Sequence, residues 1–325
     1  MVKKTKKFKV LLTRKLHDFA LKQLRIHFDI QVHSGKIPMP KNLLLKKIKD
    51  KEGLICFPYD TIDKQVINSA KKLRAISTFS VGYEQIDVRF AKKKKILIGY
   101  TPEVLTEATA DLTFSLILDL FRRVTEGDRI IRKGDWKQIY GAHDYVGTDL
   151  AGKTLGILGF GRIGKAVALR GKPFGMKIIF HNRRRLPLKI EKSTHSKFVS
   201  LNELLRKSDV VSIHVPYSKQ THQLVDMRFI KKMKKTAFLV NTARGKIIKE
   251  NDLALALNRK IIAGAALDVF ENEPIGKSDP LTKIQNVVLV PHIGSSSAET
   301  RKKMAELTVK NLILALSGKK PIYSV

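Results

Sequence analysis

The stretch T154-L-G-I-L-G-F-G-R-I-G-K-A-V-A-L-R170 contains the pattern that decides the fold. Residues 154–158 predict a short buried strand, and residues 162–174 predict a helix. Between them, the first glycine of G159-F-G-R-I-G164 permits a tight turn, the second lets a pyrophosphate approach the backbone, and the third lets the helix pack closely. The N–H groups and dipole at the helix N-terminus also attract phosphate. The stretch therefore predicts a dinucleotide site formed by Gly159, Phe160, Gly161, Arg162, Ile163 and Gly164; the alternative is a glycine turn without a ligand.

The same alternation of short apolar strands and helices continues on the C-terminal side of this stretch. Strands are predicted at residues 177–180, 209–215, 237–240, 263–269 and 287–290, with helical segments such as residues 201–207 and 251–260 between them. This order is typical of a parallel sheet covered by helices on both faces.

The first hundred residues predict a second, smaller α/β unit. Its strands are expected at residues 8–13, 30–33, 53–57, 73–77 and 96–99. Pro102 opens a long helical pattern, and residues 297–318 form an amphipathic helix with Ser297 as N-cap and Gly318 at its end. We therefore expect two Rossmann-like or flavodoxin-like lobes with parallel sheets. Residues 1–101 and 292–325 are predicted to form a discontinuous substrate-binding lobe, and residues 102–291 the inserted dinucleotide-binding lobe.

Composition limits the class of protein. A length of 325 residues suggests two domains, and no run of 18 or more apolar residues is present. The apolar run after the basic N-terminus is too short for a signal peptide. The single cysteine, Cys56, forms neither an intrachain disulfide nor a cysteine-based metal cluster. We expect a soluble cytoplasmic protein with no metal site and no membrane association.

The chain is strongly basic, with a net charge of +34 from 63 Lys and Arg against 29 Asp and Glu. Such a charge would suit a nucleic-acid-binding protein. However, the lysines lie in scattered clumps at residues 3–9, 92–95 and 231–235, and no helix-turn-helix, zinc or RNA-recognition pattern accompanies them. We therefore favour a solvated basic surface that concentrates anionic small molecules over specific nucleic-acid binding.

The end of the second strand of the large unit, I178-I-F-H-N-R-R-R185, indicates the type of dinucleotide. NAD-specific folds place Asp or Glu there to bind the ribose hydroxyls, and a carboxylate would repel a 2′-phosphate. Here the position is Asn182, followed by Arg183 and Arg184, whose guanidinium groups suit phosphate. The pattern predicts preference for NADP(H), with Arg185 the weakest candidate and NAD(H) the alternative cofactor. Solvated loop charge is the alternative explanation for these arginines.

Three polar residues each follow a different predicted strand of the large unit. Arg244 lies in N241-T-A-R-G245, Glu273 in L267-D-V-F-E-N-E-P274, and His292 in V290-P-H-I-G-S295. Taken singly, each is more often a cap, a loop charge or a surface histidine. Because the carboxyl ends of parallel strands line one crevice, the three together predict a substrate clamp and a proton donor.

These motifs, with S80-V-G-Y-E-Q-I-D87 and A263-G-A-A-L-D-V269, resemble the D-isomer-specific 2-hydroxyacid dehydrogenase family over essentially the whole chain. Within it, T101-P-E-V-L-T-E-A-T-A-D111 and Y145-V-G-T-D-L-A-G-K-T-L-G-I157 are most similar to bacterial glyoxylate/hydroxypyruvate reductases that also act as 2-ketogluconate reductases. The resemblance implies reduction of a small anionic 2-oxo acid by NADPH to a D-2-hydroxy acid.

The resemblance also implies roles for individual residues. Arg244 would hold the substrate carboxylate, and His292 would donate the proton while Glu273 favours its protonated form. Backbone N–H groups at Val81 and Gly82 would hold the substrate from the smaller lobe. Further cofactor contacts would come from Thr109, Pro216, Thr221, Thr242, Ala243, Arg244, Asp268, His292 and Gly294.

Several departures from family patterns matter for the activity. Formate dehydrogenases of this fold carry an amide at the position of Glu273, which argues against formate oxidation. Because the sequence ends at Val325, we expect no regulatory domain of the kind that many phosphoglycerate dehydrogenases carry. Trp136 and Tyr140 lie where family members send a loop towards the pocket of a neighbouring subunit. A role in the core or on the surface explains these two side chains equally well. By family analogy we expect a homodimer formed through the helix after Pro102. The alternatives are an NAD-linked dehydrogenase working oxidatively and a dinucleotide-sensing corepressor.

Overall fold

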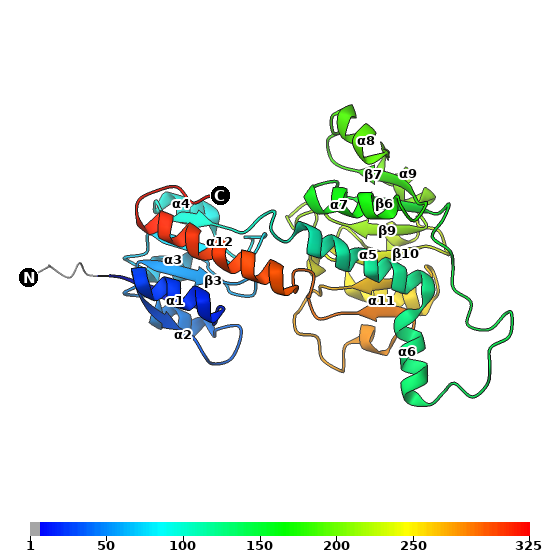
Figure 1. Ribbon diagram of the computed structural model, residues 1–325, viewed down its shortest axis with the longest axis horizontal. Helices are drawn as coiled ribbons and strands as arrows, with labels where there is room; N and C mark the ends of the chain where they lie inside the picture. The colour runs from blue at the N-terminus through cyan, green and yellow to red at the C-terminus, as the bar shows by residue number, and fades with distance from the viewer. Residues whose placement is uncertain (1–6) are drawn as a thin grey trace, which may run out of the picture. The chain divides into compact units, whose positions relative to one another are not determined.

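The computed structural model describes residues 7–325, which divide into two compact α/β units (Figure 1). Within the described range, unit 1 consists of residues 7–105 and Ser296–Val325, and unit 2 of Thr106–Ser295. The divisions therefore fall after Leu105 and Ser295, where the sequence suggested residues 101 and 291. As a result His292 belongs to unit 2, together with Arg244 and Glu273.

Unit 1 is built on a five-stranded parallel sheet in the order β2-β1-β3-β4-β5. Its elements are β1 (Phe8–Leu12), α1 (Asp18–His27), β2 (Phe28–Val32), α2 (Lys41–Lys47), β3 (Gly53–Cys56), α3 (Lys64–Ser69), β4 (Ala75–Thr78), α4 (Val88–Lys93), β5 (Leu97–Gly99) and, from the C-terminal segment, α12 (Ala298–Leu316).

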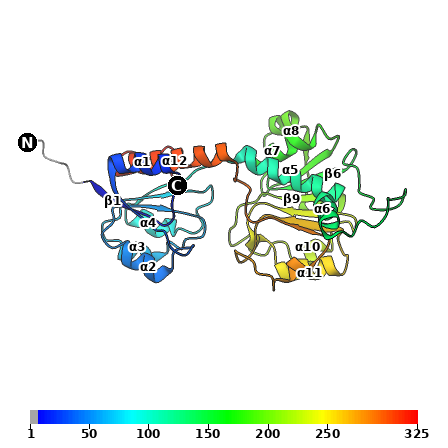
Figure 2. The same ribbon diagram turned by 60° about the horizontal axis from the view of Figure 1, so that its bottom comes forward.

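Helices cover both faces of the unit 1 sheet, as its continuous apolar strands require. On one face, Leu54 and Ile76 pack into a core with Leu44 of α2 and Val66 of α3. On the other face α12 lies beside α1 and packs across β3, β4 and β5 (Figure 2). The C-terminal helix is thus an integral layer of unit 1, which explains why the unit is discontinuous in sequence.

Unit 2 has a seven-stranded parallel sheet in the order β12-β11-β10-β9-β6-β7-β8. Its elements are α5 (Thr106–Arg122), α6 (Val124–Lys133), β6 (Thr154–Leu158), α7 (Arg162–Gly171), β7 (Lys177–His181), α8 (Leu188–Thr194), β8 (Ser196–Phe198), α9 (Leu201–Lys207), β9 (Val210–Ile213), α10 (Met227–Ile230), β10 (Phe238–Asn241), η1 (Gly245–Ile247), α11 (Glu250–Asn258), β11 (Gly264–Leu267), η2 (Pro280–Lys283) and β12 (Val287–Leu289).

Two hydrophobic cores lie on opposite faces of the unit 2 sheet. One joins the strands to α9, α10 and α11, and the other joins them to α5 and α7. Figure 2 shows α5 and α7 on one side of the sheet and α10 and α11 on the other. The chain order reverses between β6 and β9, which are neighbours in the sheet although β7 and β8 separate them in sequence. In an open parallel sheet this switch point, at the carboxyl ends of the strands, is where ligands bind.

The element boundaries differ from the sequence prediction at a few places. β8 was missed because Ser196–Phe198 has three residues and only one large apolar side chain. The long helix begins at Thr106, four residues after Pro102, because residues 103–105 form a bend and turn. The predicted N-cap of the last helix is confirmed, since the Ser297 side chain accepts a hydrogen bond from the Thr300 N–H.

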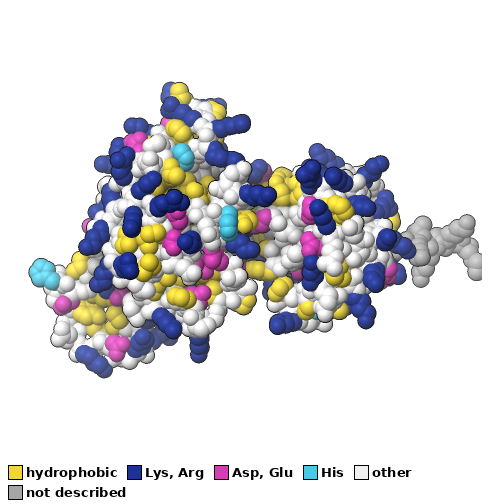
Figure 3. All heavy atoms as spheres, turned by 180° about the vertical axis from the view of Figure 1, so that it is seen from behind, with side chains coloured by type: hydrophobic (Ala, Val, Ile, Leu, Met, Phe, Trp, Pro, Cys, Tyr) yellow, Lys and Arg dark blue, Asp and Glu magenta, His cyan; other side chains and the backbone are white. Residues whose placement is uncertain are grey.

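The surface reflects the basic composition. In Figure 3, Lys and Arg side chains are scattered over the whole visible face rather than collected in one band. Of the first basic clump, residues 3–6 lie outside the described range, whereas Lys7 and Lys9 are described and contact the Arg25 carbonyl and Asp50. Among the described helices, none combines the length and the apolar character needed to cross a bilayer.

Candidate active site

The loop between β6 and α7 has the shape that its glycines predict. Gly159 has a φ of 98°, and a Cβ there would lie 2.6 Å from the carbonyl carbon of His214, so only glycine fits. A Cβ on Gly164 would lie 2.3 Å from the Gly159 carbonyl oxygen, which lets α7 pack directly on the loop. A Cβ on Gly161, by contrast, would meet no described atom within 4 Å. This open space at the N-terminus of α7 fits a pyrophosphate.

The residues after β7 have distinct environments. The Asn182 Oδ1 accepts a hydrogen bond of 2.7 Å from the Phe160 N–H and so ties the end of β7 to the glycine loop. Arg185 is engaged within the protein, because its Nε donates to Glu191 at 2.7 Å and its guanidinium lies 5.8 Å from the Phe198 ring centre. Arg183 and Arg184 are exposed, and within residues 7–325 neither forms an ion pair. Of the three arginines, these two are therefore available to a phosphate.

A hydrogen-bonded turn after β10 carries Arg244. The Asn241 side chain donates to the Arg244 carbonyl oxygen at 2.9 Å and accepts from the Ala243 N–H at 3.0 Å. Gly245 then packs against the loop after β11 so closely that a Cβ would lie 1.8 Å from the Phe270 carbonyl carbon. The turn with Arg244 is therefore held against the loop that carries Glu273.

His292 and Glu273 form a direct pair. The His292 Nδ1 lies 2.7 Å from the Glu273 Oε2, and the two side chains are mostly buried, at 25% and 15% exposure. The other carboxylate oxygen, Oε1, accepts a hydrogen bond of 2.9 Å from the Phe270 N–H. A carboxylate held in this way fixes the orientation of the imidazole ring.

Asp268 anchors the chain that follows His292. Its carboxylate accepts hydrogen bonds from the Ile293 N–H at 2.6 Å and the Gly294 N–H at 2.8 Å. The side chain is only 1% exposed, and this burial raises the pKa of Asp268 to about 6 against the opposing effect of the two hydrogen bonds. His292 itself adopts a φ of 53° in the left-handed region, a conformation that the surrounding contacts must hold in place.

The other predicted cofactor contacts lie on neighbouring segments of unit 2. Thr109 lies beside Gly294, because a Cβ added to Gly294 would be 3.4 Å from the methyl carbon of Thr109. The Thr242 hydroxyl lies 2.8 Å from the Thr113 hydroxyl, and the Thr221 hydroxyl donates to the Pro216 carbonyl at 2.8 Å. The last bond shows that Thr221 closes the turn after β9.

Val81 and Gly82 lie in unit 1, on a loop after β4 that side chains hold in shape. The Ser80 hydroxyl donates to the Gly82 carbonyl at 2.5 Å and lies 2.7 Å from the Thr78 hydroxyl. The Gln85 side-chain amide donates to the Thr78 hydroxyl at 2.9 Å. These bonds fix the backbone of the loop at Val81 and Gly82.

Sequence reasoning missed one residue that touches this region. Glu250, at the start of α11, accepts a hydrogen bond of 2.6 Å from the Glu271 N–H on the loop that carries Glu273. No sequence motif indicates the contact, because Glu250 and Glu271 are joined only through the fold. The bond between Asn182 and the Phe160 N–H was also not predicted, although both residues were selected as cofactor contacts.

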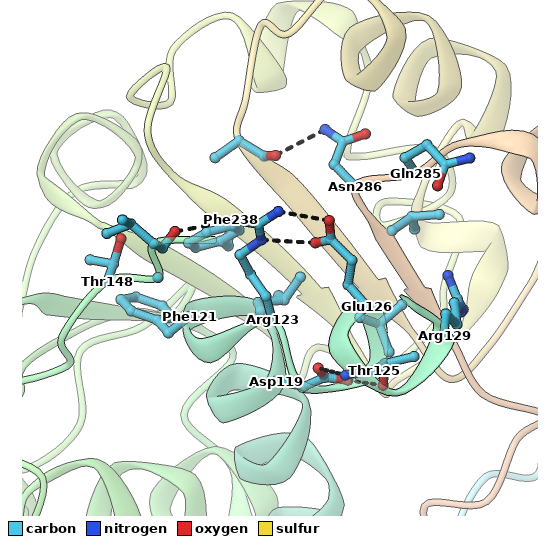
Figure 4. A pocket seen from close by; sticks show the side chains of 16 residues that line it. Asp119, Phe121, Arg123, Thr125, Glu126, Arg129, Thr148, Phe238, Gln285 and Asn286 are labelled. Atoms are coloured by element: carbon cyan, nitrogen blue, oxygen red, sulfur yellow. Dashed lines mark hydrogen bonds and ion pairs between the residues drawn. The ribbon is translucent and has the colours of Figure 1, made fainter. Parts of the chain in front are cut away.

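A separate pocket of about 280 Å³ lies at the opposite end of the unit 2 sheet (Figure 4). Phe238 at the start of β10 and Val287 at the start of β12 line it, so it adjoins the amino ends of these strands. On its α6 side, the Arg123 guanidinium makes two hydrogen bonds to Glu126, of 2.7 and 2.8 Å. The pocket is therefore distinct from the site of Arg244, Glu273 and His292.

Together, the glycine loop at the switch point and the polar residues at neighbouring strand ends define a dinucleotide-dependent oxidoreductase with a histidine hydrogen-bonded to a glutamate. Residues 114–294 match the family described as D-isomer specific 2-hydroxyacid dehydrogenase, NAD binding domain. The chain belongs to this family.

Relatives extend the match to the whole chain. It is 43% identical over 313 residues to the glyoxylate reductase of Korarchaeum cryptofilum, covering 96% of this chain and 94% of that protein. A crystal structure of a Thermus thermophilus protein is 42% identical, with a TM-score of 0.91 over 98% of this chain and 99% of that one. The NADPH-dependent glyoxylate/hydroxypyruvate reductase of Sinorhizobium meliloti, solved with NADP and malonate, is 28% identical with a TM-score of 0.87 over 98% and 97% of the two chains. The relatives thus include proteins that reduce 2-oxo acids.

Proposed function

We propose that this protein reduces small 2-oxo acids to D-2-hydroxy acids, with NADPH as the preferred hydride donor. Glyoxylate and hydroxypyruvate are the main candidate substrates, and 2-ketogluconate is a larger member of the same class. The observation that carries the proposal is the 2.7 Å pair between the His292 Nδ1 and the Glu273 Oε2 on loops next to the Arg244 turn. The reductase activity named for the Korarchaeum cryptofilum and Sinorhizobium meliloti relatives supports it.

The proposed roles follow from charge and hydrogen bonding. The Arg244 guanidinium binds the substrate carboxylate and orients the 2-oxo group. His292 donates a proton from its ring to the carbonyl oxygen while the carbonyl carbon receives the hydride, so that the ketone becomes a hydroxyl group. Glu273 stabilises the imidazolium before this transfer. In unit 1, the backbone N–H groups of Val81 and Gly82 are the proposed substrate contacts.

The residues around the glycine loop suit an NADP(H) molecule, which when bound supplies the hydride. The open space at Gly161 would admit the pyrophosphate, and Arg183 with Arg184 would bind the 2′-phosphate. Because no carboxylate occupies the position of Asn182, the 2′-phosphate meets no repulsion there. The further proposed contacts are Thr109, Phe160, Arg162, Ile163, Pro216, Thr221, Thr242, Ala243, Asp268 and Gly294. The NADP bound by the Sinorhizobium meliloti relative supports this preference.

We also propose that two copies associate through α6 and the segment that follows it. Within residues 7–325, α5 carries none of the exposed large apolar side chains, although the sequence pointed to this helix. By contrast, α6 buries no residue at all, and it exposes Val124 and Ile131. Trp136 and Ile139 in the next segment are also exposed, at 53% and 89%. A second copy of the chain would cover these side chains, and replacing Ile131 with Glu should then shift the sedimentation of the protein towards the monomer.

One assay tests the proposed reaction. NADPH oxidation should be measured with glyoxylate, hydroxypyruvate, 2-ketogluconate, pyruvate and phenylpyruvate, and then repeated with NADH. We expect turnover of the small 2-oxo acids and a higher kcat/KM with NADPH than with NADH. Absence of turnover with every substrate would contradict the proposal and favour a dinucleotide-sensing role, whereas faster turnover with NADH would contradict only the cofactor preference.

A further inference from the structure

Glu250 is a carboxylate that contacts the loop of the candidate active site from outside it. It is the first residue of α11, and its Oε1 accepts a hydrogen bond of 2.6 Å from the Glu271 N–H. α11 belongs to the face of unit 2 that packs with α10 and η2. The contact therefore connects the helical layer of unit 2 to the loop after β11.

This loop, residues 270–273, needs external anchors because it belongs to no helix or strand. Gly245 supports it from one side by packing against Phe270, and the Phe270 N–H in turn binds the Glu273 carboxylate at 2.9 Å. Between these two points, Glu271 presents its backbone N–H to Glu250. The conformation that delivers Glu273 to His292 thus depends on a contact on each side of the loop.

We propose that Glu250 is a positioning residue, which holds the Glu271 N–H and thereby keeps Glu273 in place against the His292 ring. The consequence for the reaction rests on the proposed roles of His292 and Glu273. Glu250 contacts the loop backbone and acts on the reaction only through Glu273. Loss of the bond should therefore lower kcat, which depends on proton donation, more than it changes the KM for NADPH.

The charge on Glu250 varies near neutral pH. Burial is the main cause that raises the pKa of Glu250 to about 7, and the nearby carboxylates of Glu271, Asp279 and Glu273 add to it. α10, which packs on the same helix, is preceded by Asp226, whose carboxylate pairs with Arg228. The bond to the Glu271 N–H is therefore charge-assisted above about pH 7 and weaker below it.

Two substitutions separate the acceptor from its charge. Glu250→Ala removes both, and kcat for glyoxylate should fall by tenfold to about 100-fold with little change in the KM for NADPH. Glu250→Gln keeps an acceptor oxygen and should restore kcat to within about threefold of wild type below pH 7. Above pH 7 the ratio of kcat in Glu250→Gln to kcat in wild type should fall by about fivefold, because wild type gains a charged acceptor there. Glu203→Ala, in the first turn of α9, is the matched control and should leave kcat unchanged.

A second measurement needs no turnover and so separates this inference from the proposed function. In protein labelled with ¹⁵N-glutamate, the Glu271 amide proton should resonate far downfield in wild type, move upfield in Glu250→Ala and stay near its wild-type position in Glu250→Gln. An unmoved Glu271 resonance in Glu250→Ala, or an equal loss of kcat in the Ala and Gln variants, would overturn the role of Glu250. An inactive wild type with the expected shifts would overturn the proposed reaction alone.

Discussion

The His292 Nδ1 lies 2.7 Å from the Glu273 Oε2, and further hydrogen bonds hold each side of this pair. The Glu273 carboxylate accepts a hydrogen bond from the Phe270 N–H. The Asp268 carboxylate fixes the chain after His292 by accepting hydrogen bonds from the Ile293 and Gly294 N–H groups. The orientation of the imidazole is therefore set before any substrate arrives. Such preorganisation is what a proton donor requires, because a misplaced ring transfers its proton slowly.

Removing the imidazole should abolish most of the activity without unfolding the protein. We expect His292→Ala to lower kcat for glyoxylate by roughly 100-fold to 10,000-fold, the usual contribution of a general acid. Glu273→Gln removes the charge and leaves a single acceptor oxygen for the His292 ring and the Phe270 N–H, but it keeps the imidazole, so its loss should be smaller than that of His292→Ala. Steady-state kinetics and Tm should be measured together, with the exposed His143→Ala as control. Unchanged kcat in His292→Ala would eliminate its proposed role.

The two kinds of arginine after β7 should respond differently to substitution. Arg183→Ala should lower kcat/KM for NADPH by about tenfold to 100-fold, the loss expected for a hydrogen bond to a charged group, and leave NADH unaffected. Arg185→Ala is the matched control, because its guanidinium already pairs with Glu191. The cofactor preference should survive in that variant. Equal effects of the Arg183 substitution on both cofactors would contradict the phosphate clamp.

Substitution of Asn182 tests the preference for NADPH by introducing a charge that repels the 2′-phosphate. Asn182→Asp keeps an oxygen for the Phe160 N–H, so the glycine loop should remain intact. The added negative charge would repel a 2′-phosphate but accept hydrogen bonds from the ribose hydroxyls of NAD. We expect the KM for NADPH to rise and that for NADH to fall or stay constant, both measured by initial rates. A parallel rise in both KM values would mean that the loop itself had been disturbed.

The parts of this architecture with local sequence signals could be predicted well. The strand before Gly159, the glycine turn and the helix after it follow from side-chain types within one short segment. The same holds for the N-cap at Ser297, where a hydroxyl precedes an amphipathic run. The parallel order of the sheets followed from the repeated alternation of strands and helices. These features depend on interactions between residues close in sequence.

The contacts that join distant loops had no such signal. The proximity of the His292 Nδ1 to Glu273 could be expected from the family resemblance, whereas the bond of Glu250 to the Glu271 N–H could not, because a glutamate at a helix start is common. The engagement of Arg185 by Glu191 likewise depends on how α8 packs. Sequence indicated which residues to consider, and the fold determined which of them are already paired.

The loop at Val81 and Gly82 should depend on the amide of Gln85. Gln85→Ala would free the Thr78 hydroxyl, which then no longer fixes the Ser80 hydroxyl beside Gly82. The proposed backbone N–H contact binds the substrate equally in the ground state and in the transition state. We therefore expect the KM for glyoxylate to rise by about tenfold with a smaller change in kcat. Gln85→Asn should recover part of the loss. A fall in kcat alone would contradict this assignment.

The raised pKa of Glu250 predicts how the free energy of unfolding should change with pH. Its pKa is about 7 in the folded protein against an ordinary value of 4.5, so the stabilising contribution is complete below pH 4.5 and is lost as the pH rises through 7. Glu250→Gln removes this loss.

A pKa shift of that size corresponds at most to about 3 kcal/mol, and the partial exposure of Glu250 reduces the expected gain in stability of the Glu250→Gln variant at about pH 8 to roughly 1 kcal/mol. Urea unfolding at about pH 5 and about pH 8 should show a gain for the variant only at the higher pH. There the same substitution lowers kcat, so stability and activity should change in opposite directions; a gain of equal size at both pH values would show that burial does not disfavour the charged form of Glu250.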